Sequence, residues 1–270
     1  MLLGELTWPE VKSQIRKGTV VVLPIGATEG HGPHCPLDTD INIAFEVARR
    51  AAARAGALVA PPMPYGYSTT WMHYAGTMTL ELETFIRVVF DLTSSLVRHG
   101  FKKVLVLNGH RPNGTALDAA ARLVVDKFEN RARVAVLSYW EIAAKEIHAL
   151  RRSAVGGMGH ACEFETSVQL HLRPTLVHMR RLKGLPVYPV QWDLVADPPP
   201  VKVYSDWPEP RTNPGFFGDP HKAGAEIGQK FLEVIVGKVA TFLKEFQAGA
   251  GGGTYERRSS RRARGRGIRR

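Results

Sequence analysis

The chain has 270 residues, of which 44% are hydrophobic and two are cysteines, so it can bury the core of one large domain but cannot form a disulfide framework or a four-thiolate zinc site. No apolar run reaches the ~18 to 20 residues of a membrane helix, and the N-terminus lacks a signal-peptide pattern, so we expect a cytoplasmic protein. Of the formal net charge of +11, residues 249–270 carry +7 from eight arginines and one glutamate, which leaves +4 for the other residues.

Strands and helices are predicted to alternate along the chain. Apolar runs predict buried strands at 20–25, 57–63, 103–107 and 133–139. Helical periodicity, capping residues and following glycines predict helices at 8–15, 41–55, 79–99, 115–130, 141–151, 163–172 and 219–247. Residues 182–218 are rich in proline and aromatic residues and predict a long irregular segment. This alternation predicts an α/β fold with a central, mostly parallel sheet between two layers of helices.

We expect one domain over residues 1–247, followed by a disordered tail over residues 248–270. The tail is rich in glycine and arginine and has too few apolar residues to pack. An arginine-rich tail is typical of nucleic-acid tethers, but a solvated appendage is the simpler interpretation, because residues 1–247 carry no nucleic-acid-binding motif. Neither a nucleic-acid partner nor a membrane partner is therefore expected.

Side chains that can bind metals follow the ends of the predicted strands. The loops after successive strands carry Glu29, His31 and Asp40, then Trp71 and His73, then His110, then Trp140. Because the carboxyl ends of parallel strands lie at one edge of a sheet, we expect these loops to meet there. Carboxylate oxygens and imidazole nitrogens are ligands that Zn, Mn and Fe share. The sequence therefore predicts a metal site at this edge.

A further polar cluster occupies residues 159–167. It places His160, Glu163 and Glu165 at the start of a predicted helix, where negative charge is favoured. We expect this cluster to supply the rest of the site.

Three motifs, taken in order, resemble those of the creatininase (creatinine amidohydrolase) family. They are LPIGATEGHGPHCPLDTD at 23–40, NGHRPNG at 108–114 and GHACEFETS at 159–167, and the similarity extends to about residue 245. The family pattern is E-x-H-G-x-H-L-P-x-x-T-D, N-G-H-x-x-N and H-A-G-E-x-E-T-S. The resemblance implies a creatininase-like three-layer α/β/α fold and a homohexamer. It also implies two divalent metal ions per subunit (Zn, Mn or Fe) that activate water to hydrolyse C–N bonds other than peptide bonds.

The resemblance assigns a role to each motif residue. Glu29 and His110 resemble the ligands of one metal ion, His31 and Glu165 those of the other, and Asp40 the carboxylate that bridges them. His160 resembles the histidine that transfers the proton. Glu163 is expected to orient His160 or to contact the substrate, with a carboxylate at a helix start as the simpler alternative. His34 and Asp38 are expected to support the site, Asp38 as a helix cap.

Candidates for the substrate pocket follow the second, third and fourth strands. They are Trp71, His73, Arg111 and Trp140, with Trp192 further along, although a core or interface role is equally open for the aromatic residues. Arg111 departs from the usual glycine and is expected to bind an anionic substrate group or to face solvent or another subunit. Pro112 stands where some creatinine-hydrolysing members carry a glutamate, which argues against creatinine itself. Cys35 and Cys162 also depart from the family pattern. Three interpretations are open for them: thiols next to the metal ions, a disulfide bridge, or small buried residues.

Three functions stay open at this point. The leading hypothesis is a dinuclear metal amidohydrolase that acts on a small cyclic amide or formamide, such as a creatinine-like lactam or a formamidopyrimidine, with His160 as proton donor and acceptor. The second is a family member that processes a peptide-derived cofactor precursor. The third is a non-enzymatic nucleic-acid binder that uses the arginine-rich tail.

Overall fold

The computed structural model describes residues 1–129, 131–190, 193, 195 and 208–249. Its core is a four-stranded parallel sheet made of β1 (Val21–Ile25), β2 (Leu58–Val59), β3 (Lys103–Asn108) and β4 (Arg133–Ser138), in the order β2-β1-β3-β4. The central strands β1 and β3 consist of apolar runs because helices cover both of their faces. The fold class predicted from the alternation of elements is confirmed.

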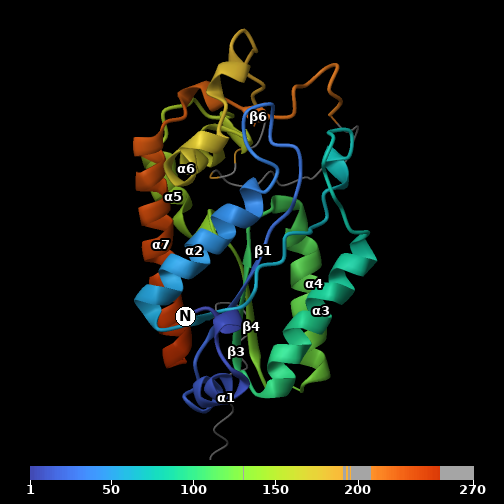
Figure 1. Cartoon of the computed structure of the whole chain (residues 1–270), viewed down its shortest axis with the longest axis vertical. Coiled ribbons are helices and arrows are strands. Elements are labelled where there is room, and N and C mark those ends of the chain that lie inside the picture. The colour runs from blue at the N-terminus through green and yellow to red at the C-terminus, as the bar shows by residue number, and fades with distance from the viewer. Residues whose placement is uncertain (130, 191–192, 194, 196–207, 250–270) are drawn as a thin grey trace, which may run out of the picture.

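Helices form a layer on each face of this sheet. They are α1 (Trp8–Arg16), α2 (Thr39–Ala55), α3 (Leu82–His99), α4 (Gly114–Lys127), α5 (Ala144–Leu150), α6 (Glu163–Leu172) and α7 (Ala225–Ala248). Figure 1 shows α3 and α4 on one side of the strands, and α2, α5, α6 and α7 on the other. One apolar cluster lies between the sheet and α3 and α4, around Phe85 and Leu117, and a second lies under α2 and α7, around Val47 and Phe231. No described helix has the length and hydropathy that a membrane span requires.

The second strand is shorter than predicted. The sequence indicated 57–63, but only Leu58–Val59 form β2. Pro61 and Pro62 lack the N–H groups that a ladder needs, so pairing stops and resumes as a single bridge between Ile25 and Met63. Pro24 is tolerated within β1 because its backbone faces the β2 side of the strand, where the ladder is interrupted. There its carbonyl accepts a hydrogen bond from the N–H of Met63. The loop after β2 therefore leaves the sheet early and can bend toward the site.

Two predicted helices differ from the observed ones. The prediction over 141–151 divides into a 3-10 turn, Glu141–Ala143, and α5. The prediction over 219–247 divides into a 3-10 turn, Pro220–Lys222, and α7, which begins after Gly224 and ends at Ala248. The predicted tail falls almost entirely on 250–270, which lie outside the described residues.

The irregular segment predicted over 182–218 contains a short strand that sequence patterns do not reveal. Phe217–Gly218 (β6) pairs antiparallel with Met158–His160 (β5), in a small sheet separate from the central one. Elements of two and three residues are too short to show a period of two, so their sequences gave no signal. This small sheet positions His160 beside the loops that follow β1 and β2.

Candidate metal centre

The loop after β1 carries the first ligands of the site into the protein interior. Glu29 and His31 are fully buried, and Asp40 follows in the first turn of α2. The loop passes so close to α2 that a Cβ on Gly26 would lie 2.5 Å from the backbone of Ile41. At the end of β3, a Cβ on Gly109 would lie 2.6 Å from the carbonyl oxygen of Asp40. Glycine at these two positions lets the two loops converge on Asp40.

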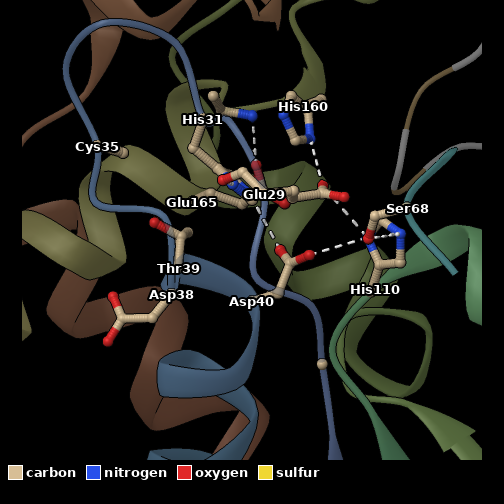
Figure 2. Close-up of polar contacts among 12 residues, drawn as sticks. Glu29, His31, Cys35, Asp38, Thr39, Asp40, Ser68, His110, His160 and Glu165 are labelled. Atoms are coloured by element: carbon tan, nitrogen blue, oxygen red, sulfur yellow. Dashed lines mark hydrogen bonds and ion pairs between the residues drawn. The ribbon is translucent and has the colours of Figure 1, made fainter. Parts of the chain in front are cut away.

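The Asp40 carboxylate lies between two histidines. Its Oδ1 is 3.0 Å from Nε2 of His31, and its Oδ2 is 2.8 Å from Nδ1 of His110. Nδ1 of His110 is also 3.3 Å from Oε1 of Glu29. Figure 2 shows these side chains converging, with Asp40 between them and Glu165 beside His31. Residues separated by up to 136 positions in the sequence therefore share one buried cluster.

Three overlapping groups in this cluster have the spacing of metal ligands. Each group offers atoms that lie within 4.8 Å of one another: Glu29, Asp40 and His110; His31, Asp40 and Glu165; and Glu29, His31 and His160. The first two groups share only Asp40, which is the arrangement needed for a carboxylate that bridges two cations. Neither Cys35 nor Cys162 belongs to any of the three groups, and both are free thiols.

Bound cations would satisfy the buried carboxylates of this cluster better than the surrounding protein groups do. Within the described ranges, neither oxygen of Glu29 accepts a well-formed hydrogen bond, although the side chain has no exposed surface. Buried carboxylate oxygens without a well-formed hydrogen bond are destabilising unless a positive charge lies beside them, and His110, 3.3 Å away, is the neighbour that supplies it in the metal-free protein. Hard and borderline divalent cations bind such mixed sets of carboxylate and imidazole ligands, so the residues present fit a metal site.

Protons take the place of cations in the metal-free protein. Burial raises the pKa of Glu29 to about 8 and that of Glu165 to about 7. Burial would lower the pKa of both histidines, but Asp40 outweighs it and raises the pKa of His31 to about 10, while Glu29 and Asp40 raise that of His110 to about 9. Both imidazoles are therefore protonated at neutral pH. A cation must displace these protons, so metal affinity rises with pH up to about those pKa values.

His160 differs from the other two histidines because it is held neutral. Burial and the nearby His31 lower the pKa of His160 well below its usual value. Nε2 of His160 donates to the carbonyl of Gly30 at 2.8 Å, so Nδ1 carries the lone pair. Nδ1 is 3.5 Å from Oε1 of Glu29, and the ring stacks on Trp71 with centroids 3.8 Å apart and planes inclined by 17°. An unprotonated nitrogen thus points toward the cluster.

A cavity of about 200 Å³ opens against this cluster. Its lining includes Asp40, His110, His160 and Glu165. Three of the expected pocket residues, Trp71, Arg111 and Trp140, also line the cavity, as does Phe217. Phe217 was missed because only the pairing of β6 with β5 places it there.

His73 does not line the cavity, contrary to the sequence-based expectation. Its side chain is 49% exposed and lies 3.9 Å from Glu209. It follows the 3-10 turn Thr69–Trp71, whose last residue, Trp71, points inward, so the next turn of the chain directs His73 to the surface. Trp192 lies outside the described residues.

The carboxylate of Glu163 binds backbone groups of the described residues and is not seen to orient His160. Its two oxygens accept the backbone N–H groups of Arg152 at 2.8 Å and Ser153 at 2.7 Å, and the side chain is fully buried. It does not line the cavity, and its hydrogen bonds tie the start of α6 to the turn that leads into β5. The structure therefore indicates an anchoring role for Glu163 rather than a catalytic one.

The substitution Glu163→Gln is expected to lower the free energy of unfolding by roughly 1–3 kcal/mol, because an amide NH₂ would face a buried backbone donor. Urea denaturation measures the change. Glu226→Gln, on the exposed face of α7, is the control and should shift stability by less than about 0.5 kcal/mol. A Glu163→Gln protein with wild-type stability and greatly reduced catalysis would restore the catalytic assignment.

Two further residues of the first motif have supporting contacts. Asp38 stands at the N-cap position of α2, but its side chain makes no cap hydrogen bond. Both of its oxygens instead bind Arg173 at 2.7 Å, and Figure 2 shows it turned away from the cluster. Nε2 of His34 lies 2.9 Å from Oγ1 of Thr166, which also contacts the carbonyl of Ala161. Thr166 belongs to the third motif but was not singled out, because its role depends on this contact across 132 residues.

Comparison with known proteins gives consistent results. The family model Creatininase, described as creatinine amidohydrolase, matches residues 4–243. A creatinine amidohydrolase of Pseudomonas putida is 32% identical over 259 residues, which cover 91% of this chain and 96% of that protein. A mycofactocin precursor peptide peptidase of Mycobacterium ulcerans is 29% identical over 262 residues, covering 91% of this chain and 89% of that protein. A solved mutant creatininase of the Zn-Zn type has a TM-score of 0.79 at 32% identity and covers 91% of this chain and 97% of that chain.

Proposed function

Because this chain belongs to the creatininase family, whose model spans residues 4–243, we propose that it is a dinuclear, metal-dependent amidohydrolase. Its substrate is a small cyclic amide or formamide, of which a non-peptide C–N bond is cleaved. One observation carries the proposal: Asp40 is shared by two groups of potential ligands, Glu29 with His110 and His31 with Glu165.

The metal ions are proposed to be Zn, Mn or Fe, since carboxylate and imidazole ligands accept all three. A related creatininase is of the Zn-Zn type, which supports two ions per subunit. When bound, two such cations would lower the pKa of a water molecule and polarise the substrate carbonyl. Two observations support metal binding by this cluster. The oxygens of Glu29 lack a well-formed hydrogen bond, and the carboxylates hold His31 and His110 in their positively charged form.

His160 is proposed to move the proton in this reaction. Its neutral ring presents the unprotonated Nδ1 toward the cluster, so it can accept a proton from the attacking water. The resulting imidazolium can then donate that proton to the departing nitrogen, which is a poor leaving group unless it is protonated. Trp71 covers one face of the ring and Gly30 holds its far nitrogen, so the ring keeps its orientation during both transfers.

A second candidate function is cleavage of a peptide-derived precursor. The similarity to a mycofactocin precursor peptide peptidase favours it, because that relative matches nearly as much of the chain as creatinine amidohydrolase does. The same cluster would serve either reaction, and the small cavity favours the small amide. A substrate panel that includes short peptides separates the two.

The proposal is tested by hydrolysis assays after metal removal. The chelated protein is expected to be inactive, and Zn or Mn is expected to restore hydrolysis of at least one compound among creatinine, hydantoins, formamidopyrimidines and short amides. Full turnover by the metal-free protein, or no hydrolysis of any amide after metal is restored, would contradict the proposal.

Two features stay predictions that rest on the family resemblance and on composition, namely a homohexamer and a cytoplasmic location. The nucleic-acid hypothesis concerns residues 250–270, which lie outside the described residues, and it also stays a prediction. We consider it the weakest of the three functions, since the described residues form a buried metal-type cluster.

A further inference from the structure

We propose that the hydroxyl of Thr166 positions two functional groups of this site through the backbone of Ala161. By holding Ala161 in a left-handed conformation, it fixes Glu165 and His160 relative to each other. The inference rests on the proposed amidohydrolase function, in which Glu165 is a metal ligand and His160 moves the proton. The three groups with ligand spacing include neither Thr166 nor Ala161.

Ala161 has a backbone conformation that alanine rarely adopts. Its φ of +48° lies in the left-handed region, which is unfavourable for a residue with a Cβ atom. Among the described residues, Glu129 is the only other non-glycine residue with a positive φ. Ala161 is fully buried and belongs to a small apolar cluster with Leu182 and Phe216. A strained conformation of this kind persists only where the surrounding contacts enforce it.

This conformation turns the chain between the proposed proton-transferring histidine and a proposed metal ligand. Ala161 directly follows His160, the last residue of β5, and α6 begins two residues later at Glu163. The turn directs the N–H of Ala161 to Oε2 of Glu165, which accepts a hydrogen bond from it. A change in the conformation of Ala161 would therefore move this N–H group and shift the backbone that carries His160.

The hydroxyl of Thr166 holds the other polar group of Ala161. Its Oγ1 lies 3.2 Å from the carbonyl oxygen of Ala161 and donates to it, because a carbonyl oxygen can only accept. The N–H and the carbonyl of Ala161 are thus bound by consecutive side chains of α6, Glu165 and Thr166. These two contacts supply the enforcement that the left-handed conformation requires.

The loop of the first motif in turn fixes the hydroxyl of Thr166. Nε2 of His34 lies 2.9 Å from Oγ1 and must donate to it, since the one hydroxyl proton goes to Ala161. Sγ of Cys35, at 3.6 Å, is a second and weaker donor. His34 is itself anchored, because its carbonyl accepts from the N–H of His178 at 2.8 Å. The hydroxyl therefore has its donor and both acceptor positions filled, which gives it a single orientation.

The test measures Zn²⁺ binding to chelated protein by calorimetry, which does not depend on catalysis. Thr166→Val keeps the shape of the side chain but removes the hydroxyl. We expect it to weaken one of the two Zn²⁺ equivalents by roughly 10- to 100-fold, the usual effect of losing an outer partner of a metal ligand. The other equivalent should be nearly unchanged, because Glu165 belongs to only one of the ligand groups that share Asp40. Thr166→Ser keeps the hydroxyl and should bind both equivalents almost as the wild type does.

A second substitution tests whether Thr166 acts through Ala161. Glycine adopts a positive φ without a steric penalty, so it needs no hydroxyl to hold it there. Adding Ala161→Gly to Thr166→Val is therefore expected to strengthen the weakened Zn²⁺ equivalent by at least about threefold, a coupling typical of neighbouring residues. Ala161→Gly alone completes the cycle. A threonine that only filled space would show no such recovery.

Thr93→Val is the matched control, because Thr93 is also a buried helical threonine but lies in α3, on the other face of the sheet. It should bind both equivalents as the wild type does. Thr166→Ala takes the place of Thr166→Val if circular dichroism shows that the valine variant does not fold.

Three results would each overturn the inference and leave the proposed function intact. They are wild-type affinity for both equivalents in the variant without the hydroxyl, an equal loss of affinity in Thr166→Ser, and no recovery when Ala161→Gly is added. A wild type that binds fewer than two equivalents would instead overturn the dinuclear function and, with it, this inference.

Discussion

Replacement of Asp40 by alanine is expected to abolish amide hydrolysis, with kcat/KM reduced on the order of 10⁴-fold, the scale seen when one member of a catalytic unit is removed. Asp40 is the shared member of both ligand groups, and its two oxygens face His31 and His110 separately. Its removal therefore weakens both proposed metal positions at once and leaves two cations without the carboxylate that offsets their repulsion. Metal analysis of the purified protein should show fewer than two ions per chain.

Asp38→Ala is the matched control for this experiment. Asp38 lies two residues earlier, at the same helix start, but its carboxylate is 46% exposed and pairs with Arg173. This variant should keep both metal ions and an activity within a few-fold of the wild type. Asp40→Asn keeps the size of the side chain but not its charge. It therefore distinguishes loss of the bridging carboxylate from a folding defect in the alanine variant. Wild-type activity in either Asp40 variant would contradict the bridging role.

Replacement of His160 by glutamine is expected to lower kcat by roughly 10²- to 10⁴-fold while both metal ions stay bound, since general acid–base catalysis contributes on this scale. Glutamine can keep the hydrogen bond to the Gly30 carbonyl that holds His160, but it cannot take up a proton at the position of Nδ1. Steady-state kinetics combined with metal analysis separates the two roles open to this residue.

His73→Gln is the control for the His160 variant, because His73 is half-exposed and does not line the cavity. It should leave both kcat and the metal content unchanged. His160 also belongs to a third group with ligand spacing, together with Glu29 and His31. A His160→Gln protein that loses metal in proportion to its activity would therefore identify His160 as a ligand and refute its role in proton transfer.

The order of strands in the sequence was enough to predict where the site would form. Glu29, Asp40 and His110 follow β1 and β3, which are neighbours in the sheet, so a rule about parallel strands brought them together. The observed convergence of their side chains agrees with that expectation. His160 and Glu165 lie outside the central sheet, so no strand pattern could place them; the polar cluster at 159–167 singled them out, and the family resemblance, confirmed by comparison, gave them roles.

The errors arose where contacts across the chain decide the direction of a side chain. Glu163 has the residue type of a catalytic acid, yet the backbone of Arg152 and Ser153 occupies both of its oxygens. Asp38 has the position of a helix cap, yet Arg173, which is 135 residues away, takes its carboxylate. Local sequence patterns specify residue type and spacing but contain no information about such distant partners, so they could not predict these roles.

The number of metal ions per chain tests the central claim most directly. Chelated protein is titrated with Zn²⁺ in a calorimeter, in two buffers with different heats of ionisation. Two equivalents are expected to bind, with release of protons near pH 7, because His31 and His110 hold protons in the metal-free cluster. Activity against an amide identified in the panel should rise with occupancy and be complete at two equivalents. Binding of fewer than two equivalents of Zn²⁺ at saturation, or full activity before any ion binds, would contradict the account.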